Sequence, residues 1–183
     1  MINISKIICL LGAGGSGKTT IGNYMKEILN IPEIISYTTR DKRKGEVDGY
    51  DYHFVDKINK EEMAEFIKRE SGIYGFKKKD IDEGLKKNNS IFLIAEINGI
   101  KQLKKIYGNK INIVFISATK EECKKRMLER GDSVYKVKER LKEDINNLEY
   151  NNWIYADFII RNKQDRLYYS CMQMKNILNI LNC

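Results

Sequence analysis

The sequence predicts an α/β fold, a doubly wound parallel sheet that carries a phosphate-binding loop. Apolar runs alternate with helical patterns along the 183 residues. Four of the five expected strands are continuous apolar runs, which is typical of parallel strands covered on both faces. The first run leads directly into a glycine-rich segment, and sheets of this kind bind ligands at the carboxyl ends of their strands. We therefore expect one domain with a continuous core.

Strands and helices are expected in alternating order. The expected strands cover residues 6–11, 33–37, 90–95, 111–116 and 158–160. Helices are expected over residues 19–29, 97–107, 120–130, about 135–149 and 164–181. Ile21, Met25 and Ile28 recur at helical spacing in the first helix, and Cys123 and Met127 do so in the third. Each of these helices should therefore turn an apolar side toward the core.

The stretch 38–87 interrupts this alternation. It is polar, with a short strand expected at 52–55 and a helix expected near 59–68. Its densest basic cluster, Lys77 to Lys79, is interpreted as a solvated loop or a helix start. We expect an inserted lobe over the sheet, with the core formed by residues 1–37 and 88–183.

Residues 12–19 read GAGGSGKT and fit the pattern G-x-x-x-x-G-K-[ST] between an apolar strand and a helix. Such glycines let backbone N–H groups turn inward on phosphates, and the helix N-terminus adds further donors. Lys18 would neutralise phosphate charge, and Thr19 would offer its hydroxyl to Mg²⁺. An ordinary glycine-rich turn needs neither residue. The residues expected to bind ATP here are Gly12, Ala13, Gly14, Gly15, Ser16, Gly17, Lys18, Thr19 and Thr20.

Two arginines flank a short polar stretch after the helix over 120–130. Arg130 and Arg140 bracket this stretch, which begins at Gly131. An arginine at each end suits a lid, about 131–140, that closes over transferring phosphates. A solvated basic helix is the alternative, and the spacing alone does not decide between them.

Composition excludes several functional classes. The net charge is +8, but the basic residues are spread along the chain, so we expect no nucleic-acid partner. Cys9, Cys123, Cys171 and Cys183 lack metal-like spacing and are expected to be reduced, which favours a cytoplasmic location. The first apolar run is too short for a signal peptide, and nothing approaches the ~20 apolar residues of a membrane span. The sequence does not indicate an oligomeric state.

Residues 36–55 read SYTTRDKRKGEVDGYDYHFV. Arg40 and Arg43, with Tyr52 beyond them, can clamp a monophosphate because arginine offers paired donors to phosphate oxygens. The stretch closely resembles the nucleoside-monophosphate site of guanylate kinases, S-x-T-T-R-x-x-R-x-G-E-x-x-G-x-D-Y-x-F, which a phosphate loop precedes. The resemblance weakens in the middle of the chain and returns at 129–131, 140–141 and 160–162, so it covers most of the chain in order.

This resemblance implies an acceptor site. Arg40, Arg43 and Tyr52 would bind the acceptor phosphate together with Tyr74, and Glu46 would orient the two arginines.

It also implies the rest of the machinery. Ser36 and a glutamate, either Glu70 or Glu96, would supply hydrogen-bond acceptors to the base. Lys18, Arg130 and Arg140 would act on the transferring phosphoryl group. Asn162 would lie near the donor adenine.

The base pocket departs from the family pattern. The family usually shows a small hydroxyl residue where this chain has Phe76. The family's D-x-D-x-Q-G is replaced by residues 94–99, so the first acid becomes Ile94 and the second becomes Glu96. The segment that should hold the base-reading glutamate is about three residues short, so either Glu70 or Lys68 could occupy that position.

The expected function is guanylate kinase activity, in which the γ-phosphoryl group of ATP passes to GMP or dGMP with Mg²⁺ as cofactor. The expected partners are small-molecule nucleotides. A related kinase acting on another small phosphate, such as ribose 1,5-bisphosphate, stays open because of the altered base pocket. A non-catalytic phosphopeptide-binding module is the second alternative, although such modules typically lack an intact phosphate loop and here Lys18 and Thr19 are both present.

Overall fold

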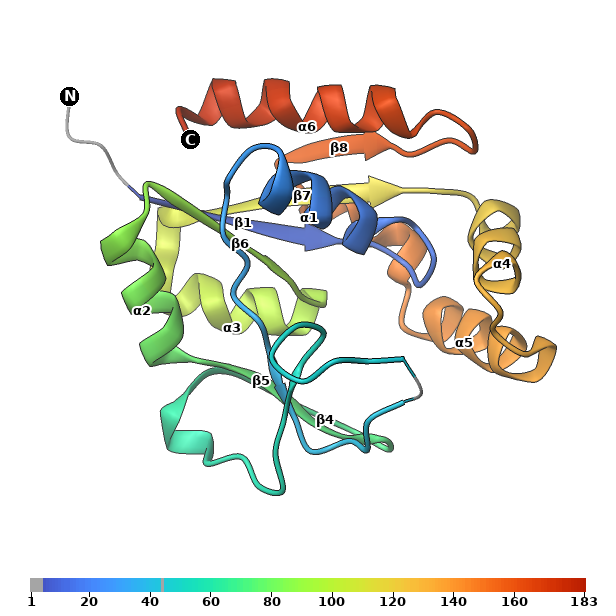
Figure 1. Cartoon of the computed structure of the whole chain (residues 1–183), viewed down its shortest axis with the longest axis horizontal. Coiled ribbons are helices and arrows are strands. Elements are labelled where there is room, and N and C mark those ends of the chain that lie inside the picture. Colours follow the sequence, from blue (N-terminus) through green and yellow to red (C-terminus); the bar gives the residue numbers. More distant parts are fainter. Residues whose placement is uncertain (1–4, 44) are drawn as a thin grey trace.

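The structure, a computed structural model, describes residues 5–43 and 45–183, so the start of the expected core segment 1–37 and residue 44 lie outside it. One sheet has the strand order β6-β1-β7-β8, and its neighbouring strands are all parallel (Figure 1). Its strands are β1 (Lys6–Leu11), β6 (Ser90–Ile94), β7 (Ile111–Ser117) and β8 (Phe158–Arg161). This sheet confirms the predicted fold class.

Helices cover both faces of this sheet. Helices α1 (Lys18–Glu27) and α6 (Leu167–Leu181) cover one face, and α2 (Lys78–Lys87) and α3 (Ile97–Tyr107) cover the other (Figure 1). Alternate residues of β1 serve the two faces: Ile8 joins the cluster under α1 and α6, whereas Ile7 joins the cluster under α2 and α3. The apolar run of β1 is therefore explained by burial on both sides.

The strand expected at 33–37 is wrong for most of its length. Only Glu33 forms a bridge, to Phe92 of β6, with Ile34 donating its N–H to the Phe92 carbonyl at 2.8 Å. The chain then leaves the first sheet, and β2 (Tyr37–Thr38) pairs with strands of a second sheet. An apolar pattern cannot distinguish these two pairings, because it does not identify the partner strand.

The second sheet has the order β3-β2-β5-β4 and contains the largest error of the sequence prediction. The short strand expected at 52–55 is present as β3 (His53–Phe54). The helix expected near 59–68 is wrong: a 3-10 turn, η1 (Lys60–Glu62), leads into strand β4 (Met63–Arg69). Strand β5 (Gly72–Lys77) pairs with it in antiparallel fashion. This hairpin supplies hydrogen-bond partners that a local helical pattern does not reveal.

The basic cluster Lys77 to Lys79 lies at the start of helix α2, which was one of its two expected interpretations. Its residue Ile81 is fully buried in the cluster shared with β1 and β6. Ala64 of β4 and Phe76 of β5 belong to the same cluster, so the second sheet shares its core with the first. The second sheet thus ends at Lys77, and α2 covers the parallel sheet.

Helices α4 (Lys120–Glu129) and α5 (Val134–Asn146) form a pair at one end of the parallel sheet (Figure 1). Ser133 caps α5 by accepting the N–H of Lys136. Helix α5 ends earlier than expected, because Leu148 has φ 54° and the 3-10 turn η3 (Glu149–Tyr155) follows. The last helix likewise begins at Leu167 instead of residue 164.

Two expectations from composition concern the described part of the chain. There, no helix has the length and apolar character needed to cross a bilayer. All four cysteines lie within it, and each is a free thiol.

The packing of α2 can be tested by truncating its buried side chain. We expect Ile81→Ala to lower the free energy of unfolding by about 2–5 kcal/mol, because it removes buried methyl groups and leaves a cavity. Lys86→Ala, at an exposed position of the same helix, should change it by less than about 0.5 kcal/mol. Urea unfolding measures both, and equal effects would mean that α2 is not anchored in the core.

Candidate active site

The phosphate loop joins β1 to α1 and depends on close backbone approach. Gly17 has φ 101°, a conformation that favours glycine, and a Cβ there would lie 2.2 Å from Nδ2 of Asn162. Lys18 turns back into the loop, where its Nζ donates to the carbonyls of Gly12 at 2.7 Å and Ala13 at 3.0 Å. Burial lowers the pKa of Lys18 to about 8, and the charge of Arg140 acts in the same direction.

The first turn of α1 faces solvent beside this loop. Thr19 and Thr20 are exposed. The Ser16 hydroxyl is buried and has no hydrogen-bond partner among the described residues. The loop thus retains an unsatisfied polar atom next to its lysine.

Side chains support the loop from behind. Asn162, 4% exposed, donates its Nδ2 to the Ser16 carbonyl at 2.8 Å and accepts the Ser170 hydroxyl at 3.0 Å. Arg126 donates to the Ser16 carbonyl at 3.1 Å and to the Asn162 carbonyl at 2.8 Å. Asn162 therefore braces the loop backbone, and its expected position near the adenine stays a prediction.

The structure distinguishes the arginines of the α4–α5 pair. Arg130 is exposed and binds Asp132 at 2.6 Å, so its side chain does not contact the loop in this structure. Arg126, one helical turn earlier, contacts the loop backbone, and sequence analysis did not select it. The spacing of four between Arg126 and Arg130 was the available signal, but it does not show which of the two faces the loop.

Helix α5 lies directly against the phosphate loop. The Gly14 N–H donates to Oδ2 of Asp144 at 2.8 Å, and the other carboxylate oxygen of Asp144 pairs with Nε of Arg140 at 3.1 Å. Glu149 is also buried near this cluster, where burial raises its pKa. The sequence analysis named Arg140 but neither of these two acids.

The expected acceptor clamp is assembled in the second sheet and the loop after β2. Arg40, 9% exposed, forms a paired contact with Glu46, with nitrogen–oxygen distances of 3.0 and 2.8 Å. Its guanidinium lies 5.3 Å from the centre of the Tyr52 ring, which meets the Tyr74 ring edge-on at 5.9 Å. The exposed Arg43 donates its backbone N–H to Glu46 at 2.8 Å. Glu46 therefore contacts the side chain of Arg40 and the backbone of Arg43, and its role in orienting both arginines stays a prediction.

The remaining acceptor-site residues lie in different environments. Ser36 is half-buried beside β3, and its carbonyl accepts the His53 N–H at 2.9 Å. Glu96, at the start of α3, forms an ion pair with Arg69 of β4. Glu70 is exposed in the turn between β4 and β5.

A glutamate that sequence analysis missed is buried in this region. Glu65 is 5% exposed, and a Cβ on Gly99 would lie 2.3 Å from its Oε1. It pairs in register with Phe76 across the β4–β5 hairpin. Burial raises the pKa of Glu65 to about 7, against the opposing effects of the Phe76 N–H and the charge of Arg69. The helix expected near 59–68 concealed Glu65, because a helix there would not pair Glu65 with Phe76 of the neighbouring strand.

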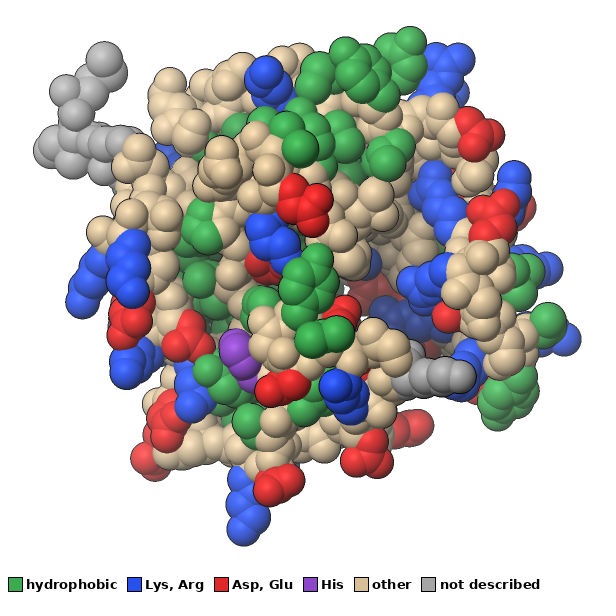
Figure 2. Space-filling view, in the orientation of Figure 1, with side chains coloured by type: hydrophobic (Ala, Val, Ile, Leu, Met, Phe, Trp, Pro, Cys, Tyr) green, Lys and Arg blue, Asp and Glu red, His purple; other side chains and the backbone are tan. Residues whose placement is uncertain are grey.

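Arg69 connects three parts of the molecule. Besides its pair with Glu96, it contacts Glu143 of α5 at 2.8 Å. The second sheet, the start of α3 and the α5 helix therefore meet at one guanidinium. Figure 2 shows the surface hollowed between the second sheet and the α4–α5 pair, with acidic and basic side chains in the recess.

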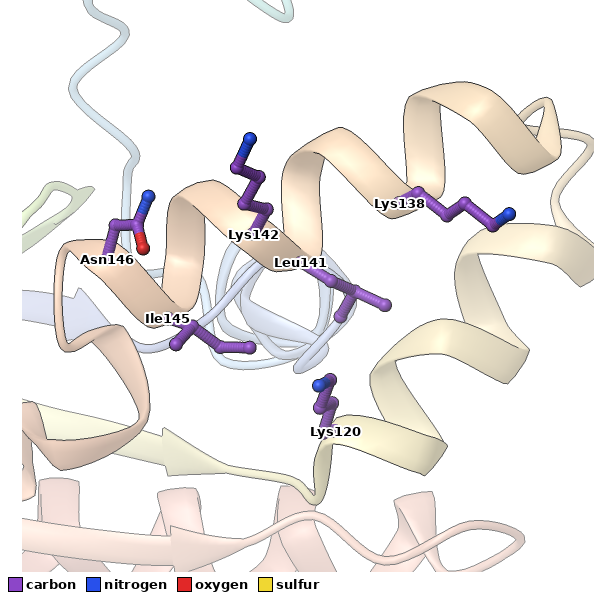
Figure 3. Close-up of a pocket in the computed structure, with 6 residues that line it drawn as sticks. All are labelled: Lys120, Lys138, Leu141, Lys142, Ile145 and Asn146. Atoms are coloured by element: carbon purple, nitrogen blue, oxygen red, sulfur yellow. The ribbon is translucent and has the colours of Figure 1, made fainter.

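A separate surface pocket of about 270 Å³ lies on another side of α5. Figure 3 shows its lining residues, which are Lys120, Lys138, Leu141, Lys142, Ile145 and Asn146. These come from the start of α4 and from α5, and none is a residue predicted to bind nucleotide.

The chain is similar over most of its length to one protein family. The family model described as guanylate kinase matches residues 4–180. A guanylate kinase from Fusobacterium nucleatum is 31% identical over 169 residues, covering 88% of this chain and 91% of that protein. One from Syntrophus aciditrophicus is 36% identical over 143 residues, covering 73% and 68%. The crystal structure of guanylate kinase from Anaplasma phagocytophilum matches the fold with a TM-score of 0.70 at 23% identity, covering 97% of this chain and 86% of that one.

The burial of Glu65 predicts a pH-dependent stability. Its pKa is raised from 4.5 to about 7, so the folded protein binds this proton more tightly than the unfolded chain. The contribution of this proton to the free energy of unfolding is fully present below the unfolded pKa of 4.5, and it is lost as pH rises through about 7. In the unmodified protein, the free energy of unfolding should fall by up to about 3 kcal/mol between about pH 5 and about pH 8. We expect Glu65→Gln to remove this fall.

Urea unfolding at the two pH values measures this difference. Glu61→Gln, at an exposed position just before β4, is the matched control and should retain the pH dependence of the unmodified protein. An unchanged pH dependence in Glu65→Gln would show that this carboxyl is not the buried acid described above.

Proposed function

Because the chain belongs to the guanylate kinase family, we propose that it transfers the γ-phosphoryl group of ATP to GMP or dGMP. The observations that support the proposal are the loop lysine Lys18, held against the loop carbonyls, and the buried ion pair between Arg40 and Glu46. We assign the first to the donor phosphates and the second to the acceptor phosphate. A kinase for small phosphates needs both a donor and an acceptor site of this kind.

The donor site would hold the phosphates of ATP. The loop amides and Lys18 suit the β- and γ-phosphates, because they place fixed donors and a positive charge at one point. Mg²⁺ is usually held by one or two protein groups together with substrate phosphates. Thr19 would contribute its hydroxyl to Mg²⁺, which supplies charge neutralisation when bound with ATP.

The acceptor site would hold the monophosphate. Arg40 is preorganised by Glu46, so its remaining donors are fixed in direction before substrate arrives. Tyr52 and Tyr74 lie beside it and offer hydroxyl groups. Arg43 is exposed, and we propose that its side chain completes the clamp when a phosphate is present.

Glu65 is the residue we propose to read the base. Guanine presents N–H donors at N1 and N2, which suit the two oxygens of one carboxylate, whereas adenine presents an acceptor at N1. Glu65 is buried in β4 against Gly99 of α3, whereas Glu70 is exposed in the hairpin turn. Glu96 is already paired with Arg69, so we assign it a supporting role in the pocket.

Transfer itself would depend on positioning and charge. The acceptor oxygen is already anionic at neutral pH, so no general base is required. Arg140 lies against the loop at Gly14, and we propose that its guanidinium contacts the phosphoryl group during transfer. Arg130 would have to leave Asp132 to assist, so we propose that it joins only on closure of the lid.

The alternatives differ in observable ways. Phe76 and Ile94 replace polar residues of the family pattern, which favours testing a sugar phosphate such as ribose 1,5-bisphosphate. A phosphopeptide-binding module would need only the acceptor clamp, and it would not explain an intact loop with Lys18 and Thr19. The cytoplasmic location and the exclusion of nucleic-acid partners stay predictions.

A coupled transfer assay with ATP tests the reaction. We expect GMP and dGMP to be better acceptors than AMP, CMP, UMP and ribose 1,5-bisphosphate. Lys18→Ala should lower kcat by at least about a hundredfold, the effect of removing one preorganised donor from a charge-stabilising site. Lys26→Ala, a matched change at the other end of α1, should have little effect. Near-normal turnover by a folded Lys18→Ala protein would refute the mechanism.

The base-reading role of Glu65 predicts a change in specificity. Glu65→Gln should lower kcat/KM for GMP by roughly tenfold to a hundredfold, because a hydrogen bond to a charged group is lost and an amide N–H faces guanine N2. IMP, which lacks the N2 amino group, should lose less. Glu70→Gln separates the two candidate glutamates, and a larger effect there would reverse the assignment.

A further inference from the structure

We propose that Asp144 is a positioning residue that fixes Arg140 against the phosphate loop through the backbone of Gly14. The proposal rests on the proposed function, in which Arg140 acts on the transferring phosphoryl group. It adds a residue of α5 that neither the sequence analysis nor the family resemblance assigned.

The contacts of Asp144 use both oxygens of its carboxylate. Oδ2 accepts the Gly14 N–H at 2.8 Å, and Oδ1 forms an ion pair with Nε of Arg140 at a distance of 3.1 Å. Asp144 is 1% exposed, so solvent cannot replace either contact. A buried carboxylate is costly unless it is paired and hydrogen-bonded, and these two partners meet that requirement. The acid is therefore tied to the loop and to the arginine together.

Gly14 is shaped to admit this pair. Its φ lies outside the left-handed region, so its backbone conformation does not by itself require glycine. A Cβ there, however, would lie 2.8 Å from Nε of Arg140 and 3.0 Å from Oδ2 of Asp144. The absence of a side chain at Gly14 is thus what lets α5 approach the loop this closely.

The arrangement has a consequence for the orientation of Arg140. Its Nε is held by Asp144, and Nη1 has a longer contact of 3.3 Å with Glu143. Because the guanidinium is planar, fixing Nε fixes the directions of the terminal N–H groups. Those groups are the ones that pair with phosphate oxygens. Asp144 should therefore act on the orientation of Arg140 more than on the affinity for the acceptor.

Charge balance supports the same role. Lys18 and Arg140 are two cations at one loop, and the charge of Arg140 lowers the pKa of Lys18 whereas that of Asp144 raises it. Glu149 faces the same cluster from η3 and also favours the charged lysine. The carboxylate of Asp144 thus lets a second cation lie beside Lys18 before any phosphate is bound.

A double-mutant cycle tests the proposal. Asp144→Asn should lower kcat by about tenfold to a hundredfold, with little change in KM for GMP, because a charge-assisted contact to Arg140 is lost. In an Arg140→Ala background the same change should alter kcat by less than about twofold. A merely structural role would give the same factor in both backgrounds, and that result would overturn the proposal.

Two further variants make the result specific. Glu139→Gln makes a matched carboxyl-to-amide change at an exposed position of the same helix and should leave kcat unchanged. Gly14→Ala displaces the pair without removing a charge and should reduce kcat in the same way as Asp144→Asn. If thermal unfolding shows that Asp144→Asn does not fold, Gly14→Ala takes its place in the test. A normal kcat in folded Gly14→Ala would overturn the proposal.

A binding measurement separates this proposal from the proposed function. Calorimetry with a non-hydrolysable ATP analogue, on the four proteins of the cycle, does not require GMP as acceptor. Coupling of Asp144 and Arg140 in analogue binding, without transfer to GMP, would retain the positioning role and refute the acceptor assignment. Transfer to GMP with additive effects of the two substitutions would retain the acceptor assignment and refute the positioning role of Asp144.

Discussion

The position of the phosphate loop is the constraint on which the rest of the structure depends. Its backbone carbonyls and amides are hydrogen-bonded from both sides: Arg126 and Asn162 hold Ser16 from behind, and Asp144 holds Gly14 from α5. Each contact comes from a different element of the chain. The loop can therefore present its amides in a fixed geometry only when β8, α4 and α5 are all in place, which makes the site a property of the whole fold.

A second set of interactions joins the two sides of the recess. Arg69 of β4 pairs with Glu96 before α3 and with Glu143 of α5. Glu143 also contacts Arg140, so a series of ion pairs connects β4 and the start of α3 to the arginine beside the phosphate loop. In kinases of this kind, closure must exclude water and align both substrates. These ion pairs form a chain across the recess, so a charged substrate that binds on one side would change the electrostatic interactions of the groups on the other side.

The buried acids explain why the base pocket is hard to read from composition. Among the residues that the structure describes, Glu65 has no ion-pair partner and lies against Gly99 and Phe76, whereas Asp144 contacts Gly14 with one oxygen and Arg140 with the other. The same carboxylate group is thus assigned base recognition in one proposal and orientation of an arginine in the other. Burial and partners make the difference, and both depend on contacts between residues far apart in the chain.

The sequence by itself determined the parallel sheet, and it predicted the phosphate loop and the acceptor clamp, because each of these patterns is encoded by local spacing. The apolar runs of β1 and β7 and the pattern from Gly12 to Thr19 need no distant partner to be recognised. Tertiary structure alone decided that residues 63–69 form a strand, since their pairing with β5 outweighs a local helical pattern. It also decided that Glu65 and Asp144 are buried, and that Arg126 meets the loop in place of Arg130. These outcomes follow from which elements pack together, and spacing along a helix or strand cannot report which of its faces meets another element.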